Sequence, residues 1–176
     1  MASFLRVRQP EFNLRSRLNE LDYDRVPYEK MPSGTVIQHV YDTGTGQHFT
    51  TTSGSWADLS WSVSITPHFA NSLMLVELSA IGQQPNTIIG ASAITVYRNN
   101  TTNIGDTANA NMGLSTVGCF QETGYITCPQ TFFVYDEPKT TANTSYNLWG
   151  RTTNGGTAYC IHSGVTRTLS VKEIKR

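Results

Sequence analysis

The residues from 59 to 66 alternate strictly between apolar and polar side chains, and this pattern limits the folds that the chain can adopt. The apolar members are Leu59, Trp61, Val63 and Ile65, and the polar members are Ser60, Ser62, Ser64 and Thr66. A period of two predicts a β-strand with one buried face and one face in water. Pro67 follows directly and is expected to end the strand, because it has no N–H group to donate.

The same kind of pattern continues through the rest of the chain. A strand is predicted over 36–41, followed by a Thr-, Gly- and Ser-rich segment, 42–58, whose composition favours turns up to the strand above. Further strands are predicted over 71–81, 88–98, 113–120, 124–128, 131–135, 145–151, 157–161 and 166–174, with a loop at 82–86 and a turn at 99–106. Leu169, Val171 and Glu173 share one face of the last strand. These patterns predict an all-β fold, an antiparallel β-sandwich or jelly roll.

The first 31 residues differ from the rest and are predicted to form an extended arm ahead of a sandwich domain at 32–176. They hold 11 of the 26 charged residues, and three prolines at 10, 27 and 32 exclude a long helix. One short amphipathic helix over 11–21 is compatible with the leucine spacing. A disordered tail is the alternative, but such tails are poor in large apolar residues. We therefore expect the arm to become ordered on a partner, through Phe4, Arg6, Arg8, Phe12, Leu14, Arg15, Arg17, Leu18, Leu21, Tyr23 and Tyr28.

The composition excludes several classes of partner. Only 15% of the residues are charged, the formal net charge is +0, and Thr, Ser, Asn and Gly fill the difference. No global field steers such a chain to nucleic acid or to a membrane surface. No apolar run approaches the ~20 residues of a membrane span, and the first residues lack the apolar core of a signal peptide. Cys119 and Cys128 could face each other across a hairpin, but the odd number of cysteines favours free thiols, buried in the fold, for Cys119, Cys128 and Cys160.

No motif in the sequence predicts catalysis, a metal or a cofactor. His39 and His48 lack the spacing of metal ligands. Cys160 and His162 share one strand face, which would allow a Cys–His dyad, although neighbours on a flat strand are more often incidental. The acidic pair at 136–137 precedes a proline and is expected to be a solvated turn.

Three tryptophans could stack on sugar rings. Trp61 and Trp149 lie in alternating strands and are predicted to be interior or at an interface. Trp56 lies among Gly and Ser residues and is the best candidate for an exposed glycan contact.

The order of several short motifs resembles a sandwich module of tailed-phage virion proteins, especially those of phages that infect cyanobacteria and marine bacteria. The first motifs are Gly34–Val40, Val63–Pro67 and Asn71–Val76, and the later ones are Tyr97–Arg98, Val134–Pro138, Thr144–Tyr146 and Glu173–Ile174. The resemblance covers about residues 34–174 and leaves the arm outside. It implies a tail-fibre or other virion structural protein without catalytic residues.

The resemblance and the arm together predict a non-enzymatic phage virion protein on the outside of the particle. We expect a homotrimer, because particle modules follow local symmetry, with the arm bound to the major capsid protein or to a tail or fibre component. A capsid decoration (cement) protein is favoured, because the chain has no coiled coil or repeat to form a fibre shaft. The alternative is a short tail fibre or receptor-binding tip that binds host surface glycan.

Overall fold

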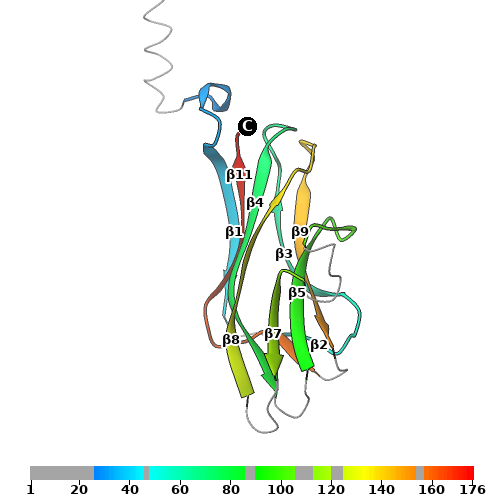
Figure 1. Cartoon of the computed structure of the whole chain (residues 1–176). Coiled ribbons are helices and arrows are strands. Elements are labelled where there is room, and N and C mark those ends of the chain that lie inside the picture. The colour runs from blue at the N-terminus through cyan, green and yellow to red at the C-terminus, as the bar shows by residue number, and fades with distance from the viewer. Residues whose placement is uncertain (1–25, 46–47, 86–89, 106–112, 120–124, 154–156) are drawn as a thin grey trace, which may run out of the picture. The chain divides into compact units, whose positions relative to one another are not determined.

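The computed structural model describes residues 26–45, 48–85, 90–105, 113–119, 125–153 and 157–176 of the chain (Figure 1). It divides into two compact units, Met1–Pro32 and Ser33–Arg176. In the first unit the described residues are 26–32, which contain one 3-10 turn, η1 (Tyr28–Lys30), with no buried residue.

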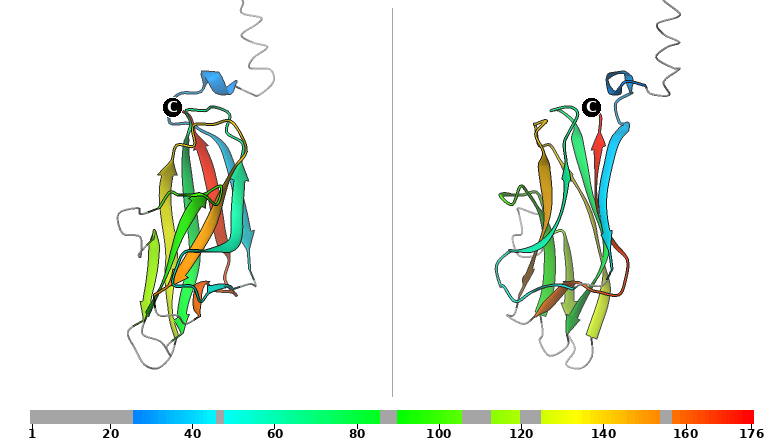
Figure 2. Two further views of the ribbon diagram at one scale, coloured as in Figure 1. Left: turned by 90° about the vertical axis from the view of Figure 1, so that its right-hand side faces the viewer. Right: turned by 180° about the vertical axis from the view of Figure 1, so that it is seen from behind.

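The second unit is an antiparallel β-sandwich, as predicted from the sequence (Figure 2). The strands of its first sheet, sheet A, are β1 (Val36–Gly44), β11 (Arg167–Ile174), β4 (Leu73–Pro85), β10 (Ala158–Ile161) and β2 (Phe49–Thr51), in that order, with β8 (Tyr125–Asp136) also paired to β4. The strands of sheet B are β3 (Ala57–Ile65), β9 (Thr144–Thr152), β5 (Gly90–Arg98) and β6 (Thr102–Asn103), in that order, with β7 (Ser115–Cys119) also paired to β5. Every pairing between these strands is antiparallel.

The core lies between the two sheets and is filled by the residues that the alternation selects. In β3 the four apolar residues at 59, 61, 63 and 65 are buried, and the residues between them are exposed. The facing layer of sheet A comes from β4, with Met74, Val76 and Leu78, and from β11. Leu169 and Val171 of β11 are fully buried, and so is the third residue predicted for that face, Glu173.

Strand β4 is longer than predicted, because the expected loop at 82–86 continues the strand to Pro85. Its partner β8 is also one strand of 12 residues, although 124–128 and 131–135 were predicted as separate strands. Pro129 lies opposite Ile81 in this ladder without a break in register. Among the described strands β8 pairs only with β4, and an edge strand tolerates proline because its missing N–H can face away from the neighbour.

Two segments predicted as turns contain short strands. In the 42–58 segment, β2 pairs with β10, and its Phe49 ring stacks on Trp61 with ring centroids 5.3 Å apart. In the 99–106 segment, β6 pairs with the end of β5. Asn99 and Asn100 both have positive φ, 51° and 55°, as in a primed turn, and the Thr101 N–H donates to the Arg98 carbonyl oxygen at 3.1 Å. Strand β2 therefore forms because of packing between segments that are distant in the sequence, and β6 forms because of the conformation of the turn before it.

Candidate functional site

The most buried charge in the described residues belongs to Glu173, on the core face of β11. Its Oε1 accepts hydrogen bonds from the backbone N–H groups of His68 at 2.8 Å and Phe69 at 3.2 Å, and from Ser72 Oγ at 2.6 Å. Its Oε2 lies 3.0 Å from His68 Nδ1. Burial alone would raise the pKa of this carboxyl, but the hydrogen bonds from Ser72, His68 and Phe69 outweigh burial and hold its pKa below the usual value. Glu173 therefore fixes the loop between β3 and β4 to the sandwich and is a structural residue.

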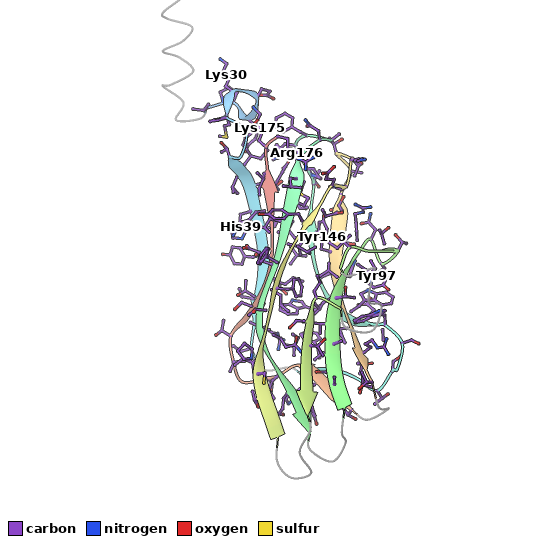
Figure 3. All side chains as sticks on the ribbon, viewed as in Figure 1. Lys30, His39, Tyr97, Tyr146, Lys175 and Arg176 are labelled. Atoms are coloured by element: carbon purple, nitrogen blue, oxygen red, sulfur yellow. The ribbon has the colours of Figure 1, made fainter. Side chains whose placement is uncertain are left out.

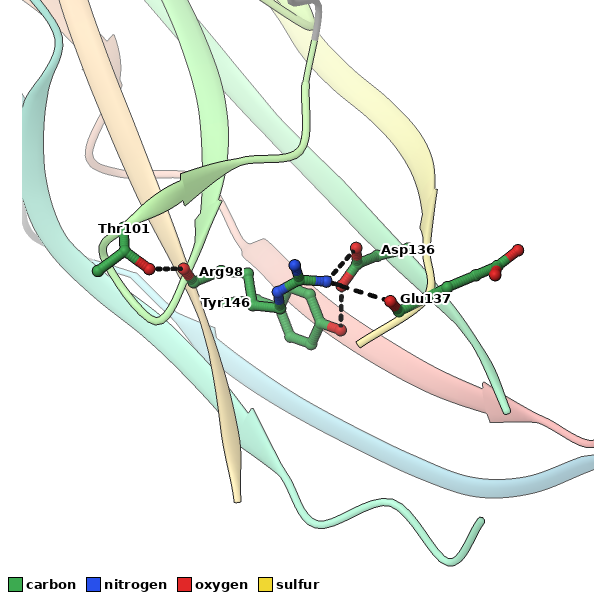
Figure 4. Close-up of polar contacts among 5 residues, drawn as sticks. All are labelled: Arg98, Thr101, Asp136, Glu137 and Tyr146. Atoms are coloured by element: carbon green, nitrogen blue, oxygen red, sulfur yellow. Dashed lines mark hydrogen bonds and ion pairs between the residues drawn. The ribbon is translucent and has the colours of Figure 1, made fainter. Parts of the chain in front are cut away.

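A second buried carboxylate joins the two sheets. Arg98 Nη1 of β5 donates to Asp136 Oδ1 and Oδ2 of β8, at 2.7 and 2.9 Å, and to the carbonyl oxygen of Glu137 at 3.3 Å (Figure 4). The Tyr146 hydroxyl of β9 donates to Asp136 Oδ2 at 2.9 Å. Burial, followed by the neighbouring carboxylate, raises the pKa of Tyr146, so the phenol keeps its proton. The prediction of a solvated turn at 136–137 is wrong for Asp136, whose side chain is 9% exposed.

The Cys160–His162 dyad is not formed. Cys160 is fully buried in the core, and burial raises the pKa of its thiol to about 12. His162 lies beyond the end of β10, where its ring packs edge-on against the His48 ring with centroids 4.8 Å apart. Burial, followed by His162 and Arg167, lowers the pKa of His48. The thiol therefore contributes to packing, because a nucleophilic cysteine requires an accessible thiolate.

We expect Cys160 to resist alkylation in the native protein. Iodoacetamide at pH 8 should label the half-buried Cys128 first and should label Cys160 only after denaturation, because the buried thiol is protonated at that pH. Peptide mass mapping of labelled protein measures both sites in one sample. Labelling of Cys160 as fast as Cys128 in native protein would contradict its burial.

An exposed aromatic surface lies on the outer face of sheet A. Here Tyr41 of β1 is 62% exposed, and Phe133 and Tyr135 of β8 are 71% and 53% exposed. Register places Tyr41 and Phe133 at the two ends of one row across β1, β11, β4 and β8. The next row runs from His39 to Tyr135, and Figure 3 shows His39 directed outward from sheet A. We call these four residues together with Leu75 the sheet A aromatic face.

The centre of this face is electrically neutral. Lys172 of β11 and Glu77 of β4 lie between the aromatic ends and form an ion pair with each other. Glu77 also lines a pocket of about 610 Å³, together with outer-face residues such as Ser79 and Phe133 and with the core-side residues Leu78, Leu114 and Phe132. Since strands lie about 4.8 Å apart, the three steps from β1 to β8 separate the aromatic ends by about 14 Å. The aromatic residues of this face are visible in the sequence at 131–135. That segment has aromatic residues on both faces of the predicted strand, so the sequence does not show which face is buried.

The residues that the sequence singles out as candidate contacts lie in different environments, some buried and some exposed. Trp61 is buried, with its indole Nε1 donating to Asp42 Oδ2 at 2.7 Å, as expected of an interior tryptophan. Trp56 is half-buried and carries the guanidinium of Arg151 5.8 Å from its ring centroid. Of the arm residues, Tyr28 is described and is 39% exposed. The arm residues that lie outside the described residues are Phe4, Arg6, Arg8, Phe12, Leu14, Arg15, Arg17, Leu18, Leu21 and Tyr23.

Within the described ranges, no group of three or more His, Cys, Asp or Glu side chains is placed to hold a metal ion. No helix in the same part of the chain has the length and apolar character needed to cross a bilayer.

No protein-family model matches the chain, and no curated protein matches its sequence. Among solved structures, it is similar to the VP2 subviral particle of infectious bursal disease virus, with a TM-score of 0.43 and 16% identity over 80% of this chain and 33% of that chain. It is also similar to the Gx strain of that virus, with a TM-score of 0.39 and 14% identity over 80% of this chain and 42% of that chain. A third similarity, to the tripod from the baseplate of bacteriophage Tuc2009, has a TM-score of 0.36 and 16% identity and covers 100% of both chains. The chain spans less than half of the two bursal disease virus chains, and similarities of this size do not transfer a function.

Proposed function

We propose that this protein is a non-enzymatic structural protein of a bacteriophage virion, which forms a homotrimer and decorates the outside of the capsid. The observation that carries the proposal is the sheet A aromatic face. Its three most exposed side chains, Tyr41, Phe133 and Tyr135, present roughly 400 Å² of aromatic surface to water, at about 200 Å² for each ring. Phe133 and Tyr135 are neighbours on the outer face of β8, and Tyr41 lies about 14 Å away, beyond the Lys172–Glu77 pair. Together the three rings amount to about half of the ~800 Å² that each partner buries in a stable interface.

The neutrality of the face favours contact between copies of the chain. Two copies would not repel each other, because Lys172 and Glu77 already neutralise one another at its centre. The sequence resemblance to phage virion modules also supports a trimer, because homo-oligomeric modules of this kind associate around a symmetry axis. The sandwich would then hold the trimer together, and the arm would be available for a second partner.

The arm is proposed to anchor the trimer to another virion protein. Its described part exposes Val26 and Tyr28 by 49% and 39%, and η1 contains no buried residue. Arg6, Arg8 and Arg15 are suited to pairing with carboxylates of an acidic partner surface.

The native mass of the full-length chain tests the trimer. We expect three times the 19.5 kDa chain mass by light scattering, both for the full-length protein and for a chain beginning at Gly34. Phe133→Ser combined with Tyr135→Ser should give a monomer, because these substitutions remove most of the aromatic surface of β8. Tyr97→Ser is the matched control, since Tyr97 is an aromatic residue on the other sheet, and it should remain trimeric. A truncated chain that is monomeric while the full-length chain is trimeric would show that the arm holds the subunits together, and would overturn the proposed division of roles.

Co-sedimentation with assembled phage heads tests the anchoring. The full-length protein should pellet with the heads, and the chain that begins at Gly34 should stay in the supernatant. A receptor-binding tip, the alternative function, would instead retain binding to host cells without its arm.

A further inference from the structure

A second aromatic pair lies on the outer face of sheet B, away from the proposed subunit contact. The rings of Tyr97 on β5 and Trp149 on β9 are stacked, with centroids 4.2 Å apart and planes inclined by 24°. Both side chains are half-buried and alternate with fully buried neighbours such as Leu148, so they point out of the sandwich. Figure 3 shows Tyr97 on this outer side, whereas Tyr146 lies between the sheets.

The pair is held in place by the primed hairpin between β5 and β6. Trp149 Nε1 donates to Asn100 Oδ1 at 3.0 Å, which fixes the indole plane. The neighbouring Asn99 accepts at its Oδ1 from the Ser145 N–H at 2.9 Å, which fixes the turn to β9. A rigid aromatic surface of this kind binds a ligand with little loss of conformational entropy.

The side chains around the pair are small, polar and mostly uncharged. Ser62 and Ser64 of β3 are exposed, and Ser62 lies opposite the amide side chain of Asn147. Asp58, also exposed, lies opposite Trp149 and places one carboxylate at the border of the aromatic surface. Hydroxyl and carboxylate groups next to an aromatic plane match a ligand with an apolar face and many hydroxyl groups at its rim.

We propose that Tyr97 and Trp149 form a binding platform for a neutral saccharide. One face of a pyranose ring consists of C–H groups, which would rest on the exposed part of the aromatic pair, while equatorial hydroxyls donate to Asp58 and exchange hydrogen bonds with Ser62. This activity goes beyond the proposed decoration role and uses a different sheet from the one proposed for trimerisation. The two proposals can therefore fail separately.

Single-stranded nucleic acid also stacks on aromatic rings, but the charges on this face disfavour it. Binding of a phosphate backbone requires a positively charged groove. Among the described residues near the pair, the negative charge of Asp58 balances the positive charge of Arg151, which lies two residues along β9 from Trp149 and packs on Trp56. A neutral ligand suits this balance better than a polyanion.

The indole N–H resonances of the full-length protein test the proposal directly. The probes are maltotriose, cellotriose, mannotriose and chitotriose, each titrated to about 10 mM, with a single-stranded oligonucleotide in a parallel titration. Trp149→Phe and Trp56→Phe assign two of the three indole signals, and the third belongs to Trp61. We expect at least one saccharide to shift the Trp149 signal in a saturable manner, with a Kd of about 1 mM, and to leave the buried Trp61 signal unchanged.

Substitution of the second ring gives an independent readout. Tyr97→Ala should weaken saccharide binding about three- to tenfold, because one half of the stacked pair is lost. Tyr159→Ala removes a half-buried aromatic ring from β10 of sheet A, outside both proposed contact surfaces, and should leave the affinity unchanged. The proposal is overturned if no saccharide moves the Trp149 signal, if only the oligonucleotide moves it, or if Tyr97→Ala and Tyr159→Ala have equal effects.

Discussion

Replacing Glu173 by alanine is expected to lower the free energy of unfolding by about 3–5 kcal/mol. The carboxylate is fully buried, and its loss leaves the backbone N–H groups of His68 and Phe69 and the hydroxyl of Ser72 without their acceptor. Glu173→Gln should have a smaller effect, about 1–2 kcal/mol, because an amide oxygen can still accept these bonds without the charge. Urea unfolding followed by tryptophan fluorescence measures the change.

Glu137 is the matched control for this substitution. It follows β8, with a side chain 45% exposed and Arg176 as its partner. Glu137→Ala should cause no measurable loss of stability, since exposed ion pairs contribute little. Equal losses for the two alanine variants would contradict the role given to Glu173.

The pH dependence of stability provides a second test of the same residue. Because the pKa of Glu173 is lower in the folded protein than its ordinary value of 4.5, the unfolded chain binds the proton more tightly. The stabilisation from this carboxylate is therefore complete above pH 4.5 and is lost as the pH falls through the lower pKa of the folded state. Glu173→Ala should lack this part of the acid destabilisation, which unfolding curves between about pH 3 and pH 6 would show.

Replacing Asp136 by alanine should lower the free energy of unfolding by about 2–4 kcal/mol. The substitution leaves the guanidinium of Arg98 and the hydroxyl of Tyr146 without an acceptor at the contact between the sheets. Glu137→Ala is the control at the neighbouring position, where an exposed carboxylate pairs with Arg176, and it should cause no measurable change.

A double-mutant cycle separates the two donors of Asp136. Tyr146→Phe alone should cost about 1 kcal/mol, the usual contribution of one hydrogen bond. In the Asp136→Ala background the same change should cost much less, since the acceptor is already absent. Additive effects of the two substitutions would show that the hydroxyl and the carboxylate do not stabilise the protein together.

The local sequence pattern was sufficient to predict which side chains are buried where a strand has one clearly apolar face. The alternation at 59–65 correctly predicted the buried residues of β3, because each side chain of a strand faces the core or the solvent in turn. The same rule placed Glu173 on the core face of β11. It could not predict how a carboxylate is stabilised there, because three of its partners, His68, Phe69 and Ser72, are more than 100 residues away in the sequence.

Other features depend on tertiary context and could not be predicted locally. Asp136 is predicted to lie in a solvated turn because the acidic pair precedes Pro138, but Arg98 and Tyr146 reach it from the other sheet. The 131–135 segment has aromatic residues on both faces of the strand, so the sequence alone does not show which of these aromatic residues are exposed. The platform at Tyr97 and Trp149 combines two strands that are about 50 residues apart, and only their pairing register brings the rings together.

The proline in β8 has a consequence for how copies of this protein can meet. A sheet whose edge offers a full row of free N–H and C=O groups can recruit strand after strand, which leads to open-ended polymers. Pro129 removes one donor from the middle of the 12-residue edge strand, which disfavours such growth along this edge. Contact between copies through the β8 edge is therefore disfavoured, whereas the side chains on the outer face of the sheet remain available for contact.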